Sequence, residues 1–100
     1  MINNYDFFKL PGAALAEVAA REKTVRRKRG YSQVQLAEKA GVSLGSLRRF
    51  EQTGKIAFES LVSIMFALGC ADELDRLFAR PAYSSIQEVI DDAEKARRTR

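Results

Sequence analysis

The chain has 100 residues, of which 17 are basic, 13 are acidic and 46% are hydrophobic. This length supports one domain, and the apolar fraction can fill a small core. The single cysteine, Cys70, excludes an internal disulfide, and without histidine there is no plausible zinc site. No apolar run approaches the roughly 20 residues of a membrane-spanning helix, and residues 1–10 lack a signal-peptide pattern. We therefore expect a cytoplasmic protein that needs no cofactor.

The residue types also argue against catalysis. The lone cysteine has no histidine to act as its base, and Ser32, Ser43 and Ser85 are explained by helix capping. The six glycines are scattered at turns and helix ends instead of forming a phosphate-binding loop. We expect that the chain is not an enzyme.

The chain is predicted to be all-helical from its first ordered element onward. Pro11 suits the first turn of a helix that runs to about Arg29 and ends at Gly30. One side of this helix carries Leu15, Val18, Ala19, Glu22 and Val25. No strand-like alternation competes anywhere.

A compact pattern of caps and turns lies between Ser32 and Glu51. Ser32 and Gln35 are spaced as a capping box, Gly41 stands where the chain must turn, and Ser43 is placed to cap a second helix. Two hydrophobic staples, Tyr31 with Leu36 and Val42 with Leu47, accompany the caps. The pattern predicts two helices joined by a tight turn.

The two helices have distinct inner and outer faces. The residues expected to meet between them are Val34, Leu36, Ala37, Ala40, Val42, Leu47 and Phe50. The outer face of the second helix carries Leu44, Gly45, Arg48, Arg49 and Gln52. Small residues followed by arginines at a helix start suit the major groove of DNA. A plain two-helix corner would not need this combination, so we favour a DNA-binding motif.

Shorter helices are predicted beyond the central motif. After a loop at Gly54, a helix is expected from Phe58 to Leu68, with Leu61, Ile64, Met65 and Leu68 facing inward. A fifth helix is expected from Asp72 to about Phe78, ended by Pro81. Ser85 and Glu88 form another possible capping box, followed by Ile86, Val89, Ile90, Ala93 and Ala96 at helical spacing.

These boundaries predict an N-terminal extension (1–12), a helix-turn-helix domain (13–80) and a C-terminal helical extension with a basic tail (81–100). The apolar residues of the two extensions, including Tyr5, Phe7, Phe8 and Leu10, can pack on the chain's own core or on a partner. Sequence reasoning leaves both possibilities open.

Basic residues concentrate before the motif and at the chain end. They are Arg21, Lys23, Arg26, Arg27, Lys28 and Arg29, and then Arg97, Arg98 and Arg100. Such runs are often just solvated helix faces. Beside a helix-turn-helix they favour phosphate neutralisation on DNA.

The string S-Q-x-x-L-A-x-x-A-G-V-S-x-x-x-L-x-x-F-E resembles the phage-repressor and Xre class of helix-turn-helix regulators, and the likeness covers about Thr24 to Phe78. The resemblance implies a five-helix, lambda-repressor-like domain that acts in the bacterial nucleoid. We expect a homodimer on a palindromic operator, because one domain makes too few base contacts for high specificity. It also implies an ion pair between Arg26 and Glu51. The implied base contacts are Ser43, Leu44, Gly45, Arg48 and Arg49, and the expected phosphate contacts are Gln33, Ser46, Gln52, Lys55 and Arg29.

This sequence departs from the family pattern where the second motif helix begins. Leu44 and Gly45 stand where polar base-readers are common, so we expect Arg48 and Arg49 to carry the hydrogen-bonded readout. Leu44 is then suited to contact a thymine methyl group.

A narrower resemblance rests on the string L-G-S-L-R-R-F-E and the short segments around it. It looks like the HipB-like antitoxins encoded beside HipA-family kinase toxins. That likeness implies an autoregulating antitoxin of a type II toxin-antitoxin operon with a HipA-like toxin as its partner. The alternative is a stand-alone Xre-type regulator with no toxin.

Overall fold

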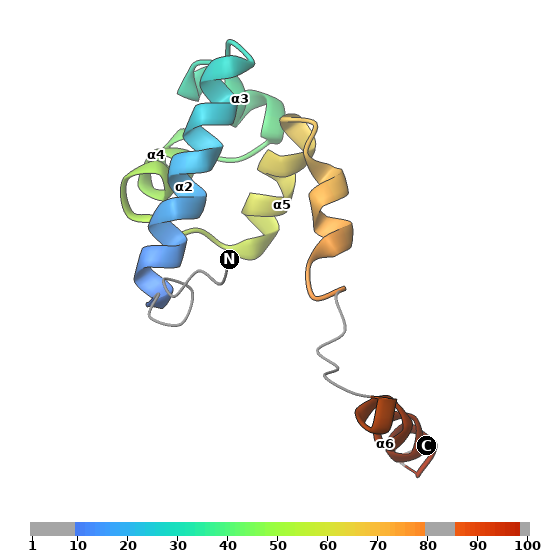
Figure 1. Ribbon diagram of the computed structural model, residues 1–100. Coiled ribbons are helices and arrows are strands. Elements are labelled where there is room, and N and C mark those ends of the chain that lie inside the picture. The colour runs from blue at the N-terminus through green and yellow to red at the C-terminus, as the bar shows by residue number, and fades with distance from the viewer. Residues whose placement is uncertain (1–9, 80–85, 99–100) are drawn as a thin grey trace.

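A computed structural model describes residues 10–79 and 86–98 of the chain. Its elements are α2 (Pro11–Lys28), α3 (Gln33–Ala40), α4 (Leu44–Thr53), α5 (Phe58–Ala67), the 3₁₀ helix η1 (Ala71–Arg76) and α6 (Ile86–Arg98). The described residues contain no strand, which confirms the all-α class. Figure 1 shows α2 to η1 gathered into one body, with α6 drawn apart from it.

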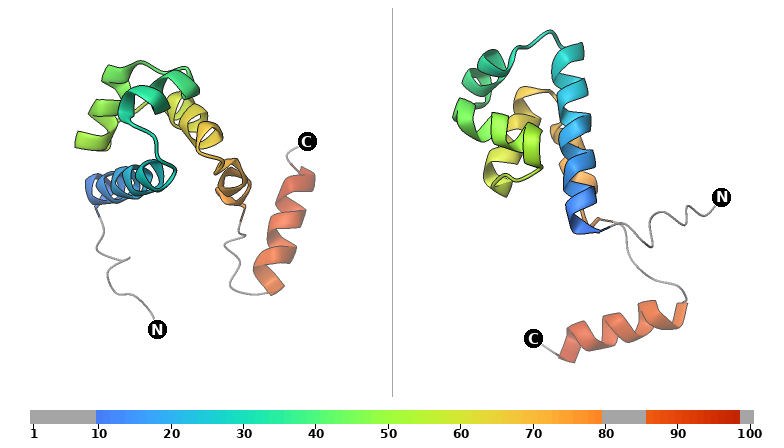
Figure 2. Two further views of the ribbon diagram at one scale, coloured as in Figure 1. Left: turned by 90° about the horizontal axis from the view of Figure 1, so that it is seen from above. Right: turned by 90° about the vertical axis from the view of Figure 1, so that its left-hand side faces the viewer.

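The core lies where α3, α4 and α5 meet. Leu36 and Ala37 of α3 pack with Leu47 of α4 and with Ile64 and Leu68 at the end of α5. Each of these side chains is almost completely buried. Helix α2 packs across α4, and η1 packs on α5, so the core is covered from both sides (Figure 2). The apolar side chains that recur at helical spacing are therefore buried mainly on the three central helices.

A glycine permits the close approach of α2 to the end of α4. Gly54 is buried and has a φ of 79°, a conformation that side-chain-bearing residues rarely adopt. A Cβ atom added there would lie 2.8 Å from the backbone carbonyl carbon of Leu15. The α2–α4 contact therefore depends on a residue without a side chain.

The prediction that Val34 lies between the two motif helices is wrong, and the apolar side of α2 is only partly buried. Val34 is 46% exposed, and on α2 Leu15 and Val18 are 45% and 36% exposed. Val34 lies near the start of a helix of only eight residues, whose buried positions are Leu36 and Ala37. Leu15 and Val18 line open clefts beside α5 instead of entering the core. Apolar periodicity identified a side of the helix that is broader than the buried strip.

The fifth predicted helix is shorter than expected and is of the 3₁₀ type. It ends at Arg76, after which Leu77 is extended and Phe78 has a φ of 58° with 97% of its surface exposed. A 3₁₀ turn has weaker hydrogen-bond geometry than an α-helix and runs in short pieces. Pro81, the cap residue Ser85 and the N-terminal aromatic residues lie outside the described residues.

Candidate nucleic-acid interface

The capping box that begins α3 has the predicted geometry. The Ser32 hydroxyl accepts a 3.0 Å hydrogen bond from the Gln35 backbone N–H, and the Gln35 side chain accepts a 2.8 Å bond from the Ser32 N–H. Gly41 ends the helix in the left-handed region with a φ of 70°. The turn that aims α4 is therefore fixed by local interactions of the predicted residues.

The start of α4 is capped by Ser43. Its hydroxyl oxygen accepts a 3.0 Å bond from the Ser46 N–H and donates its own proton to the Ser46 hydroxyl at 2.7 Å. The proton of the exposed Ser46 hydroxyl remains available to an acceptor outside the domain. Ser43 is thus committed to the cap, and Ser46 is the better placed of the two to donate to DNA.

The outer face of α4 presents mainly Gly45, Arg48, Arg49 and Gln52, all of which are exposed. A Cβ atom added at Gly45 would meet nothing within 4 Å. Leu44 differs from its neighbours, because it is half-buried and packs against the core cluster. The structure therefore brings four of the five residues assigned to this face together, and Leu44 serves the core at least in part.

A buried ion pair ties α4 to α2. Arg26 donates from Nε to Glu51 Oε2 at 2.8 Å and from Nη2 to Glu51 Oε1 at 2.9 Å, and its Nη1 donates to the Tyr31 carbonyl at 2.9 Å. The side chains of Arg26 and Glu51 are only 7% and 2% exposed. The hydrogen bonds to Glu51 raise the pKa of Arg26 above its ordinary value. This is the predicted pair, and its two parallel bonds fix the orientation of both helices.

Gln33 extends this pair to the surface. Its Nε2 donates to Glu51 Oε1 at 3.0 Å, and its Oε1 accepts from Arg48 Nε at 3.4 Å. Burial by itself would raise the pKa of Glu51, but hydrogen bonds from Arg26, Glu22 and Gln33 bring that pKa below its ordinary value. We call Arg26, Glu51, Gln33 and Arg48 the α2–α4 network. It connects a buried charge to an exposed arginine on the outer face of α4.

A comparison with protein families adds the deciding observation, since a helix-turn-helix family model matches residues 23–71, just under half of the chain. The match supports a helix-turn-helix of the Xre and Cro/C1 type for these residues. The family is DNA-binding and regulatory and is not typically enzymatic, so the match supports a DNA-binding transcription regulator. No curated protein matches the chain.

The helix-turn-helix domain also contains a buried acid that sequence reasoning assigned only to the inner side of α2. Glu22 lies one turn before Arg26, is 8% exposed, and neither of its carboxyl oxygens accepts a hydrogen bond from the described residues. Burial, together with hydrogen bonding to and charge repulsion from the nearby Glu51 carboxyl, raises the pKa of Glu22 to about 8. The sequence could have indicated this arrangement, because a single arginine, Arg26, has to serve two acids, Glu22 and Glu51.

Two of the expected phosphate contacts lie away from the outer face of α4. The Arg29 guanidinium sits beside Gly69, within 3.5 Å of where a Gly69 Cβ would lie, at the C-terminal end of α5. A cation there interacts favourably with the carbonyl end of that helix. Lys55 is exposed in the loop after α4, where its backbone N–H donates to the Thr53 hydroxyl at 3.1 Å. Gln33, Ser46 and Gln52 lie closer to the arginines.

Within residues 10–79 and 86–98, no group of three potential metal-ligating side chains comes together. In the same ranges, no helix is long and apolar enough to cross a membrane.

Proposed function

We propose that the chain is a sequence-specific transcriptional repressor that inserts α4 into the major groove of a palindromic operator. The observation that carries the proposal is the exposed Arg48 and Arg49 on a helix whose N-terminus is capped and whose orientation is held by the Arg26–Glu51 pair. Arginine forks pair with the two acceptors on the major-groove edge of guanine. Because the helix is held in one orientation, its arginines meet the base pairs in a single register.

The two arginines are positioned differently for reading bases. Arg48 is steered by the Gln33 side chain, whereas the Arg49 side chain reaches solvent from the same turn. Gln33, Ser46 and Gln52 are proposed to contact phosphates around this face, whereas Lys55 and Arg29 are proposed to contact phosphates farther from it. Phosphate contacts position the domain, and base contacts specify the sequence.

A homodimer is part of the proposal. One domain of this size places a single helix in the groove, which makes too few base contacts for high specificity. Two copies related by a twofold axis would read two half-sites about one helical turn, or roughly 34 Å, apart.

The direct test is selection of bound duplexes from a random pool, followed by footprinting on the promoter that precedes the chain's own gene. We expect one palindromic sequence to be enriched and protected. Arg49→Ala should cost about 1–3 kcal/mol of binding free energy and relax the preference at one base position. Arg76→Ala, on the exposed end of η1, is the control and should bind like the unaltered chain. Equal loss on all sequences with Arg49→Ala would make it a phosphate contact.

Gln33→Ala separates two roles of that residue. A pure phosphate contact predicts uniform weakening on every duplex. Loss of the bond to Arg48 predicts in addition a changed preference at the base that Arg48 reads. We expect the second result, measured as binding to the selected operator and to its single-base variants.

We further propose that this repressor is the autoregulating antitoxin of a HipA-like kinase toxin, in keeping with the resemblance of the L-G-S-L-R-R-F-E segment. The supporting observation is that large apolar side chains lie exposed outside the outer face of α4, among them Phe66 at 64% exposure. Co-expression with the product of the adjacent gene tests this. A stable complex that Phe66→Asp abolishes supports the antitoxin, and a neighbour that is not kinase-like leaves the stand-alone regulator.

A further inference from the structure

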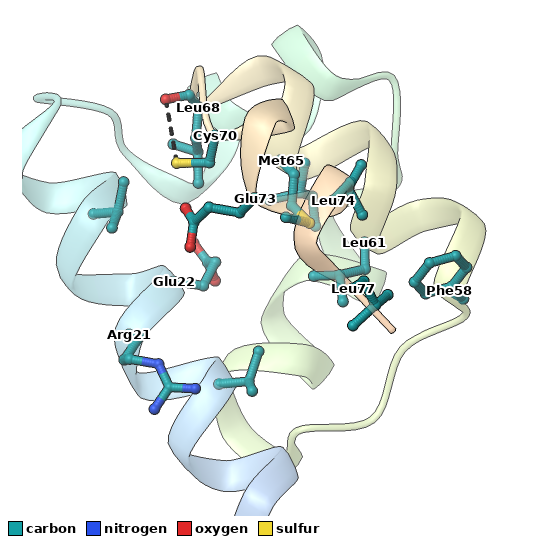
Figure 3. A pocket seen from close by; sticks show the side chains of 13 residues that line it. Arg21, Glu22, Phe58, Leu61, Met65, Leu68, Cys70, Glu73, Leu74 and Leu77 are labelled. Atoms are coloured by element: carbon teal, nitrogen blue, oxygen red, sulfur yellow. Dashed lines mark hydrogen bonds between the residues drawn. The ribbon is translucent and has the colours of Figure 1, made fainter. Parts of the chain in front are cut away.

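An apolar cleft of about 450 Å³ lies beside α2, next to the Arg26–Glu51 pair. It runs between α2, α5 and η1, and its lining includes Val18, Phe58, Leu61, Leu74 and Leu77. Figure 3 shows Phe58, Leu61, Leu74 and Leu77 on one side of this cleft and Glu22 on α2 opposite. Phe58 and Leu77 remain 59% and 50% exposed, so the cleft is an uncovered apolar surface at the edge of the core.

The cleft contains a polar group that needs a donor. Glu22 lines it, is 8% exposed, and has two oxygens that accept no hydrogen bond from the described residues. Glu73 of η1 lines the same cleft. Buried polar atoms in proteins are normally paired, so an occupant with an apolar body and a cationic end would satisfy this surface.

Helix α6 has those two properties. Ile86, Val89, Ile90 and Ala93 recur at helical spacing on one face, and the first three are 80%, 44% and 46% exposed. Arg97 continues the same face one turn beyond Ala93, because it lies eleven residues after Ile86. None of the thirteen residues of α6 is buried. A helix of this length is marginal in water unless its apolar face is covered.

We infer that α6 of a second copy of this chain occupies the α2–α5–η1 cleft, with Arg97 directed to the acids that line it. The inference rests on the proposed dimer and names its surface. Within one chain α6 is drawn apart from the body formed by α2 to η1 (Figure 1). Reciprocal exchange of α6 between two copies fills both clefts and covers the apolar faces of both α6 helices. It also closes the assembly around a twofold axis.

The lone cysteine of the chain makes the contact measurable, because Cys70 lies in the cleft. One chain carries Cys70→Ala together with a new cysteine on the apolar face of α6, by Ile86→Cys, Ile90→Cys or Ala93→Cys. It is mixed with tagged, otherwise unaltered chain and treated with a short bismaleimide. We expect a covalent heterodimer whose linked peptides contain Cys70 and the new α6 position. Glu88→Cys and Lys95→Cys, on the opposite face of α6, are the matched controls and should link at least tenfold less.

The same experiment contains the results that overturn the inference. Links between two α6 helices without links to Cys70 would mean that the helices pair with each other. Linking within one chain, seen when the Ala93→Cys substitution is made with Cys70 retained, would mean that α6 folds back. Equal linking from both faces of α6 would mean random collision.

Two substitutions then test the chemistry of the contact by sedimentation equilibrium. Ile90→Asp should raise the dimer dissociation constant at least about tenfold, the effect of losing one buried aliphatic side chain. Arg97→Ala should raise it severalfold, whereas Arg98→Ala, which removes the exposed pair with Glu94, should leave it unchanged. Equal effects of Arg97→Ala and Arg98→Ala would refute the assignment of Arg97.

DNA binding is measured separately on a single half-site. A monomeric Ile90→Asp chain that still binds the half-site supports both proposals, because the reading helix is intact. An exchanged dimer that binds no duplex would refute the repressor and leave the interface standing. A dimer that binds its operator without Cys70 links would refute the interface alone.

Discussion

The α3–α4 corner and the segment from η1 to α6 are both built from short helices, but they reach stability in opposite ways. The corner has two side-chain caps, a left-handed glycine between them and fully buried Leu36 and Leu47. The segment after α5 has a 3₁₀ turn, a residue at positive φ, and a final helix with no buried residue. The corner is complete within one chain, whereas the later segment presents surfaces that need a partner.

The strongest test of this contrast removes one acid from each region. Glu51→Ala leaves Arg26 buried without its partner and should lower the free energy of unfolding by about 3–5 kcal/mol. Glu94→Ala removes the exposed pair with Arg98, whose side chains are 48% and 78% exposed, and should change it by less than about 0.5 kcal/mol. Urea denaturation measures both, and similar losses would refute the contrast.

A second pair of substitutions compares apolar side chains. Leu47→Ala should cost about 2–5 kcal/mol, because Leu47 is fully buried and the cavity cannot collapse easily. Ile90→Ala should cost less than about 0.5 kcal/mol at a dilution where the chain is monomeric. A large loss from Ile90→Ala in the monomer would show that α6 packs on its own domain.

The buried acid gives the corner a pH dependence. Because the pKa of Glu22 is raised from 4.5 to about 8, the folded chain keeps a proton that the unfolded chain loses within that interval. Stability from this group is therefore complete below about pH 4.5 and falls as the pH rises toward 8, with a slope of at most about 1.4 kcal/mol per pH unit. Glu22→Gln should flatten the slope, and Glu59→Gln, at the exposed start of α5, should not. Equal slopes in denaturation across this range would contradict the assignment.

The smallest expected effect concerns the caps. Ser32→Ala removes one half of the capping box and should lower the free energy of unfolding by about 1 kcal/mol, measured by urea denaturation. Ser63→Ala provides the control, because the Ser63 hydroxyl only bonds the Glu59 carbonyl within α5. A loss as large with Ser63→Ala would show that the cap has no special role.

The interactions that the sequence predicted well are those fixed by spacing. Ser32, Gln35, Gly41 and Ser43 act within one helical turn, so their positions determine their partners. The Arg26–Glu51 pair is long-range and was predicted only through the family resemblance.

The features that sequence reasoning missed depend on three-dimensional placement. Val34 fits the apolar period but lies outside the buried strip, and Arg29 turns toward the end of α5. Gln33 bonds Glu51 and Arg48, which lie fifteen and more residues away, and no local rule pairs them. Glu22 shares Arg26 with Glu51 only because α2 crosses α4. The way the helices cross determines each of these contacts, and the spacing of residues along the chain does not encode that crossing.

Gly45 is a position on α4 that carries no side chain. It sits on the outer face of α4 in open space, so any side chain fits there without repacking the domain. Replacing a helical glycine also tends to stabilise a helix, by roughly 0.5–1 kcal/mol for alanine. A library randomised at this single position can therefore be screened for altered operators with folding held constant, which makes the domain a convenient starting point for reprogramming DNA specificity.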